Sequence, residues 1–577
     1  MSGALPESVT PKTRKIFALP TFDWGPLVWV VAVAIVVYLV CIPIGFIIYE
    51  SFTKESGAFS LVNYLRVLRR SYVIQAISNT ILMALGIGAL SVLVGVPLAF
   101  GVSRTNMAGK AFVKNAVIVA IMTPPFLLAM AYIILAGPNA GLVNRLIRTL
   151  FHLSMDVGPF NVFSLWALVV LGVPTGAAIV FLQVFPALEN MDPYLEESAR
   201  MSGAGPARTA LTVTLPLMRP AIFSGVLLTF GSTVAMYGVP HMLNIKVLTI
   251  AIRESVVLMD FKAGAVLSVM VTIMSLGAVF LYRVSVRSGK RFQTITARGF
   301  RPNVMRLKRS RHLFTAFGVA YALFAFVVPY STLAMTSFLK SLGLGLNWEN
   351  LTFRNYAQLV HTPLPRLAFT NSMVLGIGTA SVAMALGIVI GYLIVHFSGR
   401  GPQALDYLAG LPMGIAGTAL AAGLIFMYLT APLSYLSLYA TLWLLLIAYV
   451  TRQLPVAVRY CQSALMQIGS ELEEASRMCG ATWFQTLRKI TIPLAKTGIV
   501  YAWILVFIQA FPELSSSILL RNVGTDVVST AILDLWDGSG GLPLASAFAA
   551  IVFLLVTGMV AVAQKAGGRS LIGTSQM

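Results

Sequence analysis

The sequence predicts an all-α polytopic membrane protein with twelve transmembrane helices, arranged as two parallel six-helix repeats. Only 11% of the 577 residues are charged and 58% are hydrophobic, whereas a soluble domain carries roughly 25% charged residues. Apolar runs recur along the whole chain, and each is long enough to cross a hydrocarbon core of about 30 Å. A polar segment between these runs occurs twice without a gap, with Glu197 matching Glu474. Together these observations indicate a duplicated membrane protein.

Twelve apolar segments are predicted to cross the membrane as helices, because backbone polar groups in lipid must be satisfied within the segment. They lie at residues 26–49, 77–102, 113–136, 162–185, 219–240, 263–283, 313–338, 369–397, 406–429, 438–459, 497–519 and 543–564. The expected domains are a first transmembrane domain at 26–284 and a second at 313–565, with a basic linker at 285–312 and terminal segments at 1–25 and 566–577.

The basic residues predict the orientation. Residues 283–311, between spans six and seven, hold ten basic residues and no acid, and loops rich in Lys and Arg stay in the cytoplasm. Both termini and both polar loops are therefore expected to be cytoplasmic. The external loop 50–76 argues the other way, because it holds four basic residues against two acids.

The net charge of +21 fits this positive-inside pattern, so the expected surroundings are a lipid bilayer and not nucleic acid. Residues 1–24 precede a long apolar segment without a small-residue cleavage site, which indicates an uncleaved signal anchor. The scattered Cys41, Cys461 and Cys479 predict neither a disulfide framework nor a metal cluster.

The repeat extends beyond the polar segments. Four features of the first half recur 292 positions later: Asn63-Tyr64 at Asn355-Tyr356, Asn79 at Asn371, Gly86 at Gly378 and Gly95 at Gly387. The polar segments recur 277 positions later, so the first half should carry about 15 extra residues, most simply in the external loop around 137–161. Six spans in each half make the halves parallel repeats.

Each polar loop is predicted to form a short helix, a turn and a second short helix. The first loop opens with Asp192-Pro193, an N-cap followed by proline. The second opens with Ser470 and Glu473, the spacing of a capping box. Gly203 and Gly480 can adopt the left-handed conformation that ends a helix. The second short helix of each loop is expected to end at a proline, Pro216 or Pro493.

Glu197-Ser198-Ala199, Gly203 and Leu215-Pro216, repeated as Glu474-Ala475-Ser476, Gly480 and Ile492-Pro493, resemble the EAA loop of binding-protein-dependent ABC importer permeases. The resemblance covers about 60–280 and 350–565 and implies a type I importer permease fold. It implies that each loop docks in a cytoplasmic ATPase and transmits its closure. The implied coupling residues are Glu197, Ala199, Gly203 and Pro216 in the first loop, and Glu474, Ala475, Gly480 and Pro493 in the second. The chain departs from the pattern at Ser198 and Ser476, which stand in place of alanines.

No nucleotide site is found in the chain. Gly109-Lys110 and Gly289-Lys290 lack the upstream glycine and the following Ser or Thr of a P-loop. The chain is thus expected to be a non-catalytic subunit without a catalytic residue, metal or cofactor of its own. ATP would be bound by two copies of a partner ATPase, one for each loop.

Four residues near the outer ends of spans five and eleven are candidates for the translocation pathway: Met236, Tyr237, His241 and Glu513. An ionisable group such as Glu513 in an apolar span usually faces a pathway or a partner. The segments around Gly238-Val239-Pro240 and Glu513-Leu514 resemble the ferric-iron subgroup of importer permeases, although Met236 stands where that subgroup leads us to expect an acid. Ferric iron is the first expectation, with 2-aminoethylphosphonate, thiamine and polyamines as alternatives. A periplasmic binding protein would deliver the solute to this bacterial inner-membrane subunit.

Two other classes are weighed. A secondary transporter of the major facilitator type also has twelve spans, but residues 102–113 lack its Asp-Arg-x-Gly-Arg pattern and the spans offer few ionisable residues for ion coupling. A membrane enzyme is disfavoured, because the loops hold no His/Asp cluster or nucleophile pair.

Overall fold

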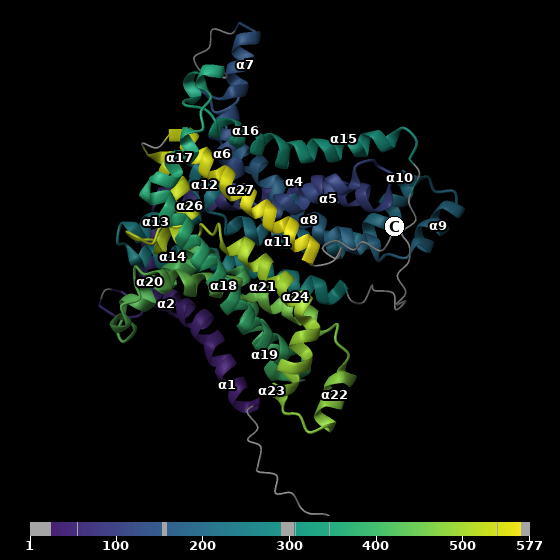
Figure 1. Ribbon diagram of the computed structural model, residues 1–577, viewed down its shortest axis with the longest axis vertical. Coiled ribbons are helices and arrows are strands. Elements are labelled where there is room, and N and C mark those ends of the chain that lie inside the picture. Colours follow the sequence, from purple (N-terminus) through teal and green to yellow (C-terminus); the bar gives the residue numbers. More distant parts are fainter. Residues whose placement is uncertain are drawn as a thin grey trace, which may run out of the picture.

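The computed structural model describes residues 25–54, 56–152, 158–289, 305, 307–344, 347–397, 399–538 and 541–566. The described residues are almost all helical (Figure 1). The first half runs α1 (Gly25–Val36), α2 (Ile42–Phe52), α3 (Val62–Leu68), α4 (Ser71–Arg104), α5 (Lys110–Met122), α6 (Pro125–Ala136), α7 (Leu142–Leu150), α8 (Leu165–Glu189), α9 (Pro193–Met201), α10 (Pro206–Thr209), α11 (Leu215–Val234), α12 (Gly238–Met242), α13 (Leu248–Val257) and α14 (Phe261–Gly289).

The second half repeats the order of the first. It runs α15 (Ser310–Ala322), α16 (Val328–Ser337), α17 (Arg354–His361), α18 (Pro363–His396), α19 (Arg400–Gly410), α20 (Gly417–Leu429), α21 (Leu442–Leu465), α22 (Ser470–Met478), α23 (Trp483–Thr486), α24 (Ile492–Ala510), α25 (Ser517–Leu520), α26 (Val528–Asp537) and α27 (Gly541–Ala566). In this half α7 has no counterpart, and residues 430–441 alone connect α20 to α21. The extra residues of the first half thus lie between α6 and α8, as predicted.

Ten helices of the described chain are long and apolar enough to cross a membrane. Two further helix pairs, Lys110–Met122 with Pro125–Ala136 and Arg400–Gly414 with Gly417–Leu429, are bent by 103° and 107°. The count reaches the predicted twelve if each bent pair is one span. Spans three and nine, predicted at 113–136 and 406–429, are each broken into two helices. The first break falls at Thr123-Pro124, where proline supplies no N–H for the helix ladder.

The spans that follow the polar loops also differ from prediction. A π-helical turn, Ala210–Thr214, joins α10 to α11, so the second short helix and span five form one continuous helix. Leu487–Thr491 does the same between α23 and α24. Pro216 and Pro493 therefore lie inside a helix rather than at its end. The widened turn fits a proline two residues later, since that residue has no N–H for a regular bond.

The glycines of the repeat mark where helices approach closely. A Cβ added to Gly86 would lie 3.1 Å from the Val169 side chain, and one added to Gly378 would lie 3.2 Å from Leu446, which is the equivalent residue. Gly95 faces α8, and Gly387 faces α21, at still shorter range. The repeat read from sequence is therefore a repeat of helix contacts, and it packs α4 on α8 and α18 on α21.

The repeated asparagines hold chain turns on the side away from the polar loops. The Asn63 side-chain amide donates to the carbonyls of Ser51 and Thr53, at 3.2 and 2.9 Å. Asn355 donates in the same way to Ser337 and Leu339, both at 2.8 Å. Each asparagine thereby satisfies carbonyls at the end of a first span, which have no partner within their own helix.

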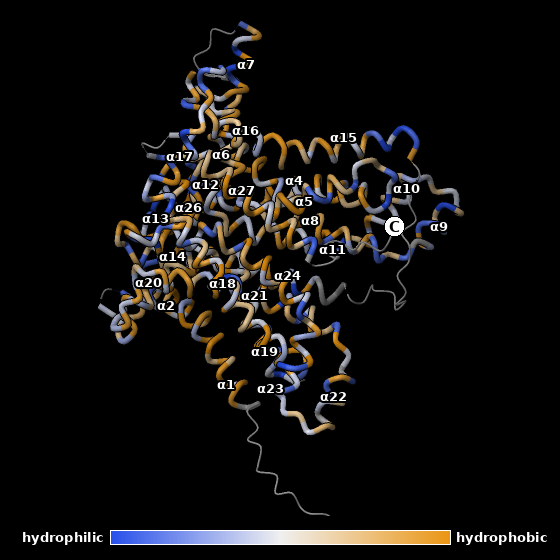
Figure 2. Tube along the Cα trace, viewed as in Figure 1, coloured by the Kyte–Doolittle hydropathy of each residue, from blue (hydrophilic) through white to orange (hydrophobic). Residues whose placement is uncertain are grey.

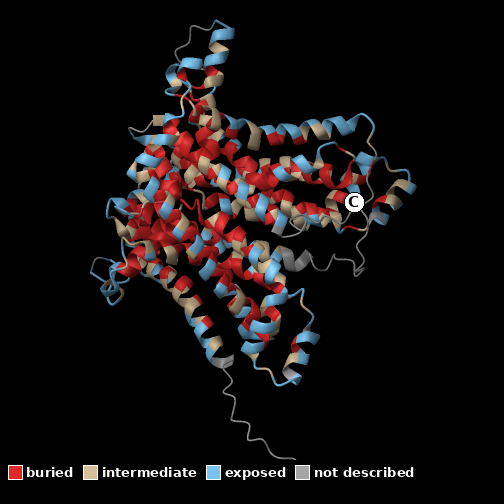
Figure 3. Ribbon diagram, in the orientation of Figure 1, coloured by how far each residue is buried: buried red, intermediate tan, exposed pale blue. Residues whose placement is uncertain are grey.

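The first helix of each half packs on the opposite half. Val36, Leu39 and Val40 are buried against a cluster from the second half that includes Leu393 and Leu454. In return, a Cβ on Gly318 of α15 would lie 2.7 Å from Val113 of α5. Figure 2 shows apolar spans with polar loops at their ends. The buried residues gather where the two halves meet (Figure 3).

Charged residues of the segment 50–76, which was expected to be external, form ion pairs with the segment before α14 and with its start. Arg66 and Arg70 contact the Asp260 carboxylate at 3.1 and 2.8 Å. Lys262 contacts Glu50 at 2.6 Å.

Candidate functional site

The two polar loops lie at the far ends of helix groups that diverge from the core, with α9 and α22 well apart (Figure 1). Asp192 caps α9, and its carboxylate accepts a hydrogen bond from the Tyr194 N–H at 2.9 Å. Gly203 and Gly480 end the two helices with φ of +84° and +81°. The left-handed glycine and the Asp192 cap are confirmed as predicted.

The capping box expected at Ser470 and Glu473 depends on the Ser470 side chain, which lies outside the described residues. The structure shows the partners of the Glu473 carboxylate. Glu473 is 4% exposed, and its carboxylate accepts a hydrogen bond from Thr491 Oγ1 at 2.8 Å. A capping box is present one helix later, where Thr482 and Gln485 bond reciprocally at the start of α23. An acid three residues after a serine satisfies the pattern, but burial decided where this carboxylate points.

The implied coupling residues lie on both loops but differ in exposure. Gly203, Gly480, Glu474 and Ala475 are exposed, and Glu197 and Ala199 are partly exposed. Pro216 and Pro493 lie inside the following helices, away from the loop tips.

Sequence reasoning missed the apolar residues that the loops expose. Met201 is 90% exposed and Met478 is 89% exposed. They are equivalent residues, the last of α9 and of α22. Leu195 and Leu472 are a second exposed, equivalent pair. The same shift that aligned the acids aligns these residues, so it could have revealed them. Exposed apolar side chains at a polar loop indicate a surface that a partner covers.

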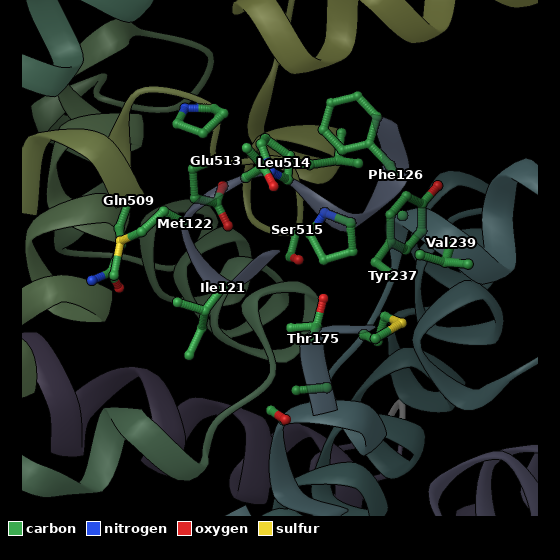
Figure 4. Close-up of a pocket in the computed structure, with 18 of the residues that line it drawn as sticks. Ile121, Met122, Phe126, Thr175, Tyr237, Val239, Gln509, Glu513, Leu514 and Ser515 are labelled. Carbon is green, nitrogen blue, oxygen red and sulfur yellow. The ribbon is translucent and has the colours of Figure 1, made fainter. Parts of the chain in front are cut away.

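A cavity of about 290 Å³ lies between the two halves, where several helices break (Figure 4). Its walls come from the α5–α6 break, from α8 at Thr175, from residues 232–239, from Arg452 and Gln453 of α21, and from residues 508–515. Of the four residues predicted for the pathway, Met236, Tyr237 and Glu513 line this cavity. His241 does not line the cavity; its ring stacks on Tyr237 with centroids 5.2 Å apart.

Glu513 is 6% exposed and lies in the break after α24, not within a span as predicted. Its carboxylate accepts hydrogen bonds from the Ser516 N–H at 3.1 Å and from Ser517 Oγ at 3.1 Å. Arg452 Nε lies 3.5 Å away. These partners compensate the charge of the carboxylate, which caps α25 and is part of the cavity wall.

The charged pair of the cavity belongs to the second half alone. Arg452 corresponds to Thr175 of the first half, and Glu513 corresponds to Met236. The Arg452 side chain is 30% exposed, and its contact with Glu513 is through Nε. Sequence reasoning missed Arg452, although a basic residue within an apolar span is the same kind of signal as Glu513.

Comparisons with known proteins agree on one class. The family described as binding-protein-dependent transport system inner membrane component matches residues 91–291 and 383–566. A putative ferric transport system permease protein of Haemophilus influenzae is 26% identical over 83% of this chain and 75% of its own length. The ferric transport system permease protein FbpB of Actinobacillus pleuropneumoniae is 25% identical over 88% and 74%.

Other similar proteins carry other names. The spermidine/putrescine transport system permease protein PotC of Haemophilus influenzae is 25% identical over 44% of this chain and 95% of its own length. Among solved structures, a bacterial ABC transporter involved in import of the acidic polysaccharide alginate is 19% identical. It covers 45% of this chain and 98% of its own, with a TM-score of 0.36.

Proposed function

Because the chain belongs to the family of binding-protein-dependent transport system inner membrane components, we propose that its two polar loops dock two ATPase subunits that drive import of a solute. The chain is a multi-pass permease subunit of an ABC importer, and in this family that subunit is non-catalytic. ATP binding is assigned to two copies of a separate ATPase. The loops and both termini would face the cytoplasm, and a solute-binding protein would deliver cargo on the other side.

The observation that carries the docking proposal is the matched exposure of α9 and α22. Each loop exposes a methionine, Met201 or Met478. A glutamate, Glu197 or Glu474, precedes it by four residues on the same helix. Methionine is enriched at protein–protein interfaces, and exposed apolar side chains rimmed by polar ones mark interaction surfaces. Glu197 and Glu474 would pair with basic residues of the ATPase, and the open backbone at Gly203 and Gly480 would permit close approach.

Charge reversal tests docking. Glu474→Arg should reduce the amount of ATPase that copurifies with the permease by about tenfold, since a lost interface charge pair costs 1–2 kcal/mol or more. Glu349→Arg is the matched control, because Glu349 is an exposed acid in the loop after α16, on the opposite side of the membrane in this topology. Equal ATPase recovery from wild type and from Glu474→Arg, Glu197→Arg and Gly480→Asp would overturn the docking proposal.

Ferric iron is the proposed cargo. Its support is the name of the two relatives that share about a quarter of their residues over most of this chain. The described residues hold no group of three His, Cys, Asp or Glu that could ligate a metal ion. A ferric cargo would therefore cross without a protein ligand cluster in the described part of the pathway, and tight binding would belong to the solute-binding protein.

An anionic organic solute such as 2-aminoethylphosphonate is a second candidate. The observation that favours it is Arg452, whose partly exposed side chain lies on the cavity wall while the single acid there, Glu513, is already engaged. Guanidinium binds phosphonate-like groups through paired N–H donors. A polyamine, by contrast, would meet this positive charge.

Uptake into vesicles containing the complete transporter distinguishes these cargoes. Labelled ferric iron, 2-aminoethylphosphonate, thiamine and spermidine are supplied in turn with the solute-binding protein and internal ATP. Accumulation of iron alone supports the first proposal. Accumulation of the phosphonate, lost on Arg452→Gln, supports the second and overturns the first.

A further inference from the structure

Each polar loop is tied into the fold by a buried glutamate. This glutamate directly precedes the one that matches the EAA pattern, Glu197 or Glu474. Glu196 is 1% exposed and accepts a hydrogen bond from Thr214 Oγ1 at 2.8 Å. Glu473, its equivalent, is 4% exposed and accepts from Thr491 Oγ1 at 2.8 Å. Both threonines end the π-helical turn that leads into the next span. The two ties are the same bond in the two repeats.

A buried carboxylate needs a positive partner, because desolvation of an unpaired charge is costly. In the first half the partner is Arg104, the last residue of α4, which is fully buried with Nε 3.8 Å from Glu196. Arg104 also donates to the carbonyls of Leu188 at 2.8 Å and Met191 at 3.2 Å, at the end of α8. It therefore joins α4, α8 and α9 at one point.

In the second half the partner is a histidine. His396, the last residue of α18, occupies the position equivalent to Arg104 at the shift of the repeat. Its Nε2 lies 2.9 Å from Glu473 Oε2, and the Tyr392 hydroxyl donates to the same oxygen at 3.3 Å. The His396 ring stacks on Tyr392 with centroids 4.1 Å apart, and Trp483 of α23 packs on Tyr392.

Both nitrogens of His396 face oxygen atoms. Nδ1 lies 3.2 Å from the Tyr392 carbonyl, which can only accept, so Nδ1 carries a hydrogen. Nε2 then needs a proton between itself and the Glu473 carboxylate. The titratable groups in contact with the ring are Tyr392 of its own helix and Glu473 of α22. The His396–Glu473 pair is therefore protonated. It holds one proton in addition to the single N–H of a neutral imidazole facing an ionised carboxylate.

We propose that Glu196 and Glu473 are positioning residues that lock α9 and α22 to the ends of α4 and α18, and that only the second lock depends on a proton. Loss of the proton from the His396–Glu473 pair leaves the ring with one N–H for two acceptors and removes the positive partner of a buried carboxylate, which releases α22. Arginine does not lose its proton in proteins, so Arg104 keeps α9 locked. The two loops thus respond differently to cytoplasmic pH. This inference rests on the proposed docking role of the loops for its meaning in transport.

Matched spin labels test the lock in the permease alone. Cys479 is a native, exposed cysteine directly after α22, and Ser202 is its equivalent after α9. One sample carries a label on Cys479, and the other carries Ser202→Cys with Cys479→Ser. Cys41 and Cys461 are replaced by serine in both samples. Because only the lock at α22 depends on a removable proton, raising the pH from about 6 to about 8.5 should increase the mobile fraction several-fold at 479 and leave it unchanged at 202.

Exchanging the two bases supplies the decisive variants. His396→Arg should abolish the pH response at 479, and Arg104→His should create one at 202. Glu473→Gln should leave the 479 label mobile at every pH, and gel filtration checks that each variant stays folded. The proposal is overturned if both labels respond equally to pH or if His396→Arg leaves the response at 479 unchanged. These measurements use no ATPase, so they can fail while docking holds, and docking can fail while they succeed.

Discussion

At the scale of single residues, several charges that look exposed in the sequence are engaged within the fold. Asp260 is an example, since it joins the start of α14 to α3 and to the start of α4 through Arg66 and Arg70. Burial alone would raise the pKa of the Asp260 carboxyl. The hydrogen bonds from Arg70 and from the Ala263 N–H, with the charges of Arg66 and Arg70, bring this pKa below its usual value.

Asp260→Asn should lower the stability of the detergent-solubilised protein by about 1 kcal/mol, because asparagine can still cap the helix but carries no charge to pair with Arg66 and Arg70. Since the pKa is lower in the folded state, the stabilisation is present above the unfolded carboxyl value of about 4 and is lost as the pH falls below it. The difference between wild type and variant should therefore be full at about pH 7 and shrink toward about pH 4. Thermal unfolding midpoints measure it.

Asp537→Asn is the matched control, because Asp537 is the equivalent residue of the second half, is 67% exposed and lies 4.0 Å from His241. Its effect should stay within about 0.5 kcal/mol, as for most surface substitutions. Equal losses of stability at the two positions would contradict the role given to the Asp260 ion pairs.

At the scale of elements, the glycines of the long helices set how closely the spans pack. A Cβ at Gly95 would lie 2.6 Å from the Ala177 carbonyl oxygen, and one at Gly387 would lie 2.9 Å from the carbonyl carbon of Ala457. Real Cβ atoms do not come this close to backbone, so alanine at either position must push two spans apart. Gly277 of α14, in contrast, has no heavy atom within 4 Å of the added Cβ.

Gly95→Ala and Gly387→Ala should each lower stability by about 1–3 kcal/mol, the cost of overpacking a tight contact. Gly277→Ala is the control and should be neutral or stabilising by up to about 1 kcal/mol, since alanine favours helix. Thermal unfolding of the three variants in one detergent compares them directly. If Gly277→Ala lowered stability as much as Gly95→Ala does, the close approach of two helices at Gly95 would not explain the loss of stability.

The prediction of helix ends succeeded where it depended on neighbouring residues. It failed where contacts between distant parts of the chain determine the position of a side chain or the course of a helix. Asp192 as an N-cap and Gly203 as a helix end follow from their own backbone positions. Glu473 was misplaced because its partners, His396 and Thr491, are remote in sequence, and only the fold brings them together. The broken spans were missed because hydropathy measures apolar length and is blind to a 103° bend.

At the scale of the whole molecule, internal duplication was the most informative signal. The two shifts of the repeat predicted which residues are equivalent, and the structure confirms them in pairs such as Gly86 with Val169 and Gly378 with Leu446. The cavity could be predicted only in part. Glu513 and Tyr237 stood out by type and position, while Arg452 and Thr175 join them from other helices that no local pattern connects.

The exchange of first helices between the halves has a consequence for biosynthesis. Residues such as Val36 and Leu39 of the first span are buried against Leu393 and Leu454, which leave the ribosome several hundred residues later. During translation this span must wait in the bilayer with its packing face against lipid, until the second half is inserted. A chain that ends before α18 would therefore leave the Val36 and Leu39 face of this span without its partners, for quality-control proteases to recognise.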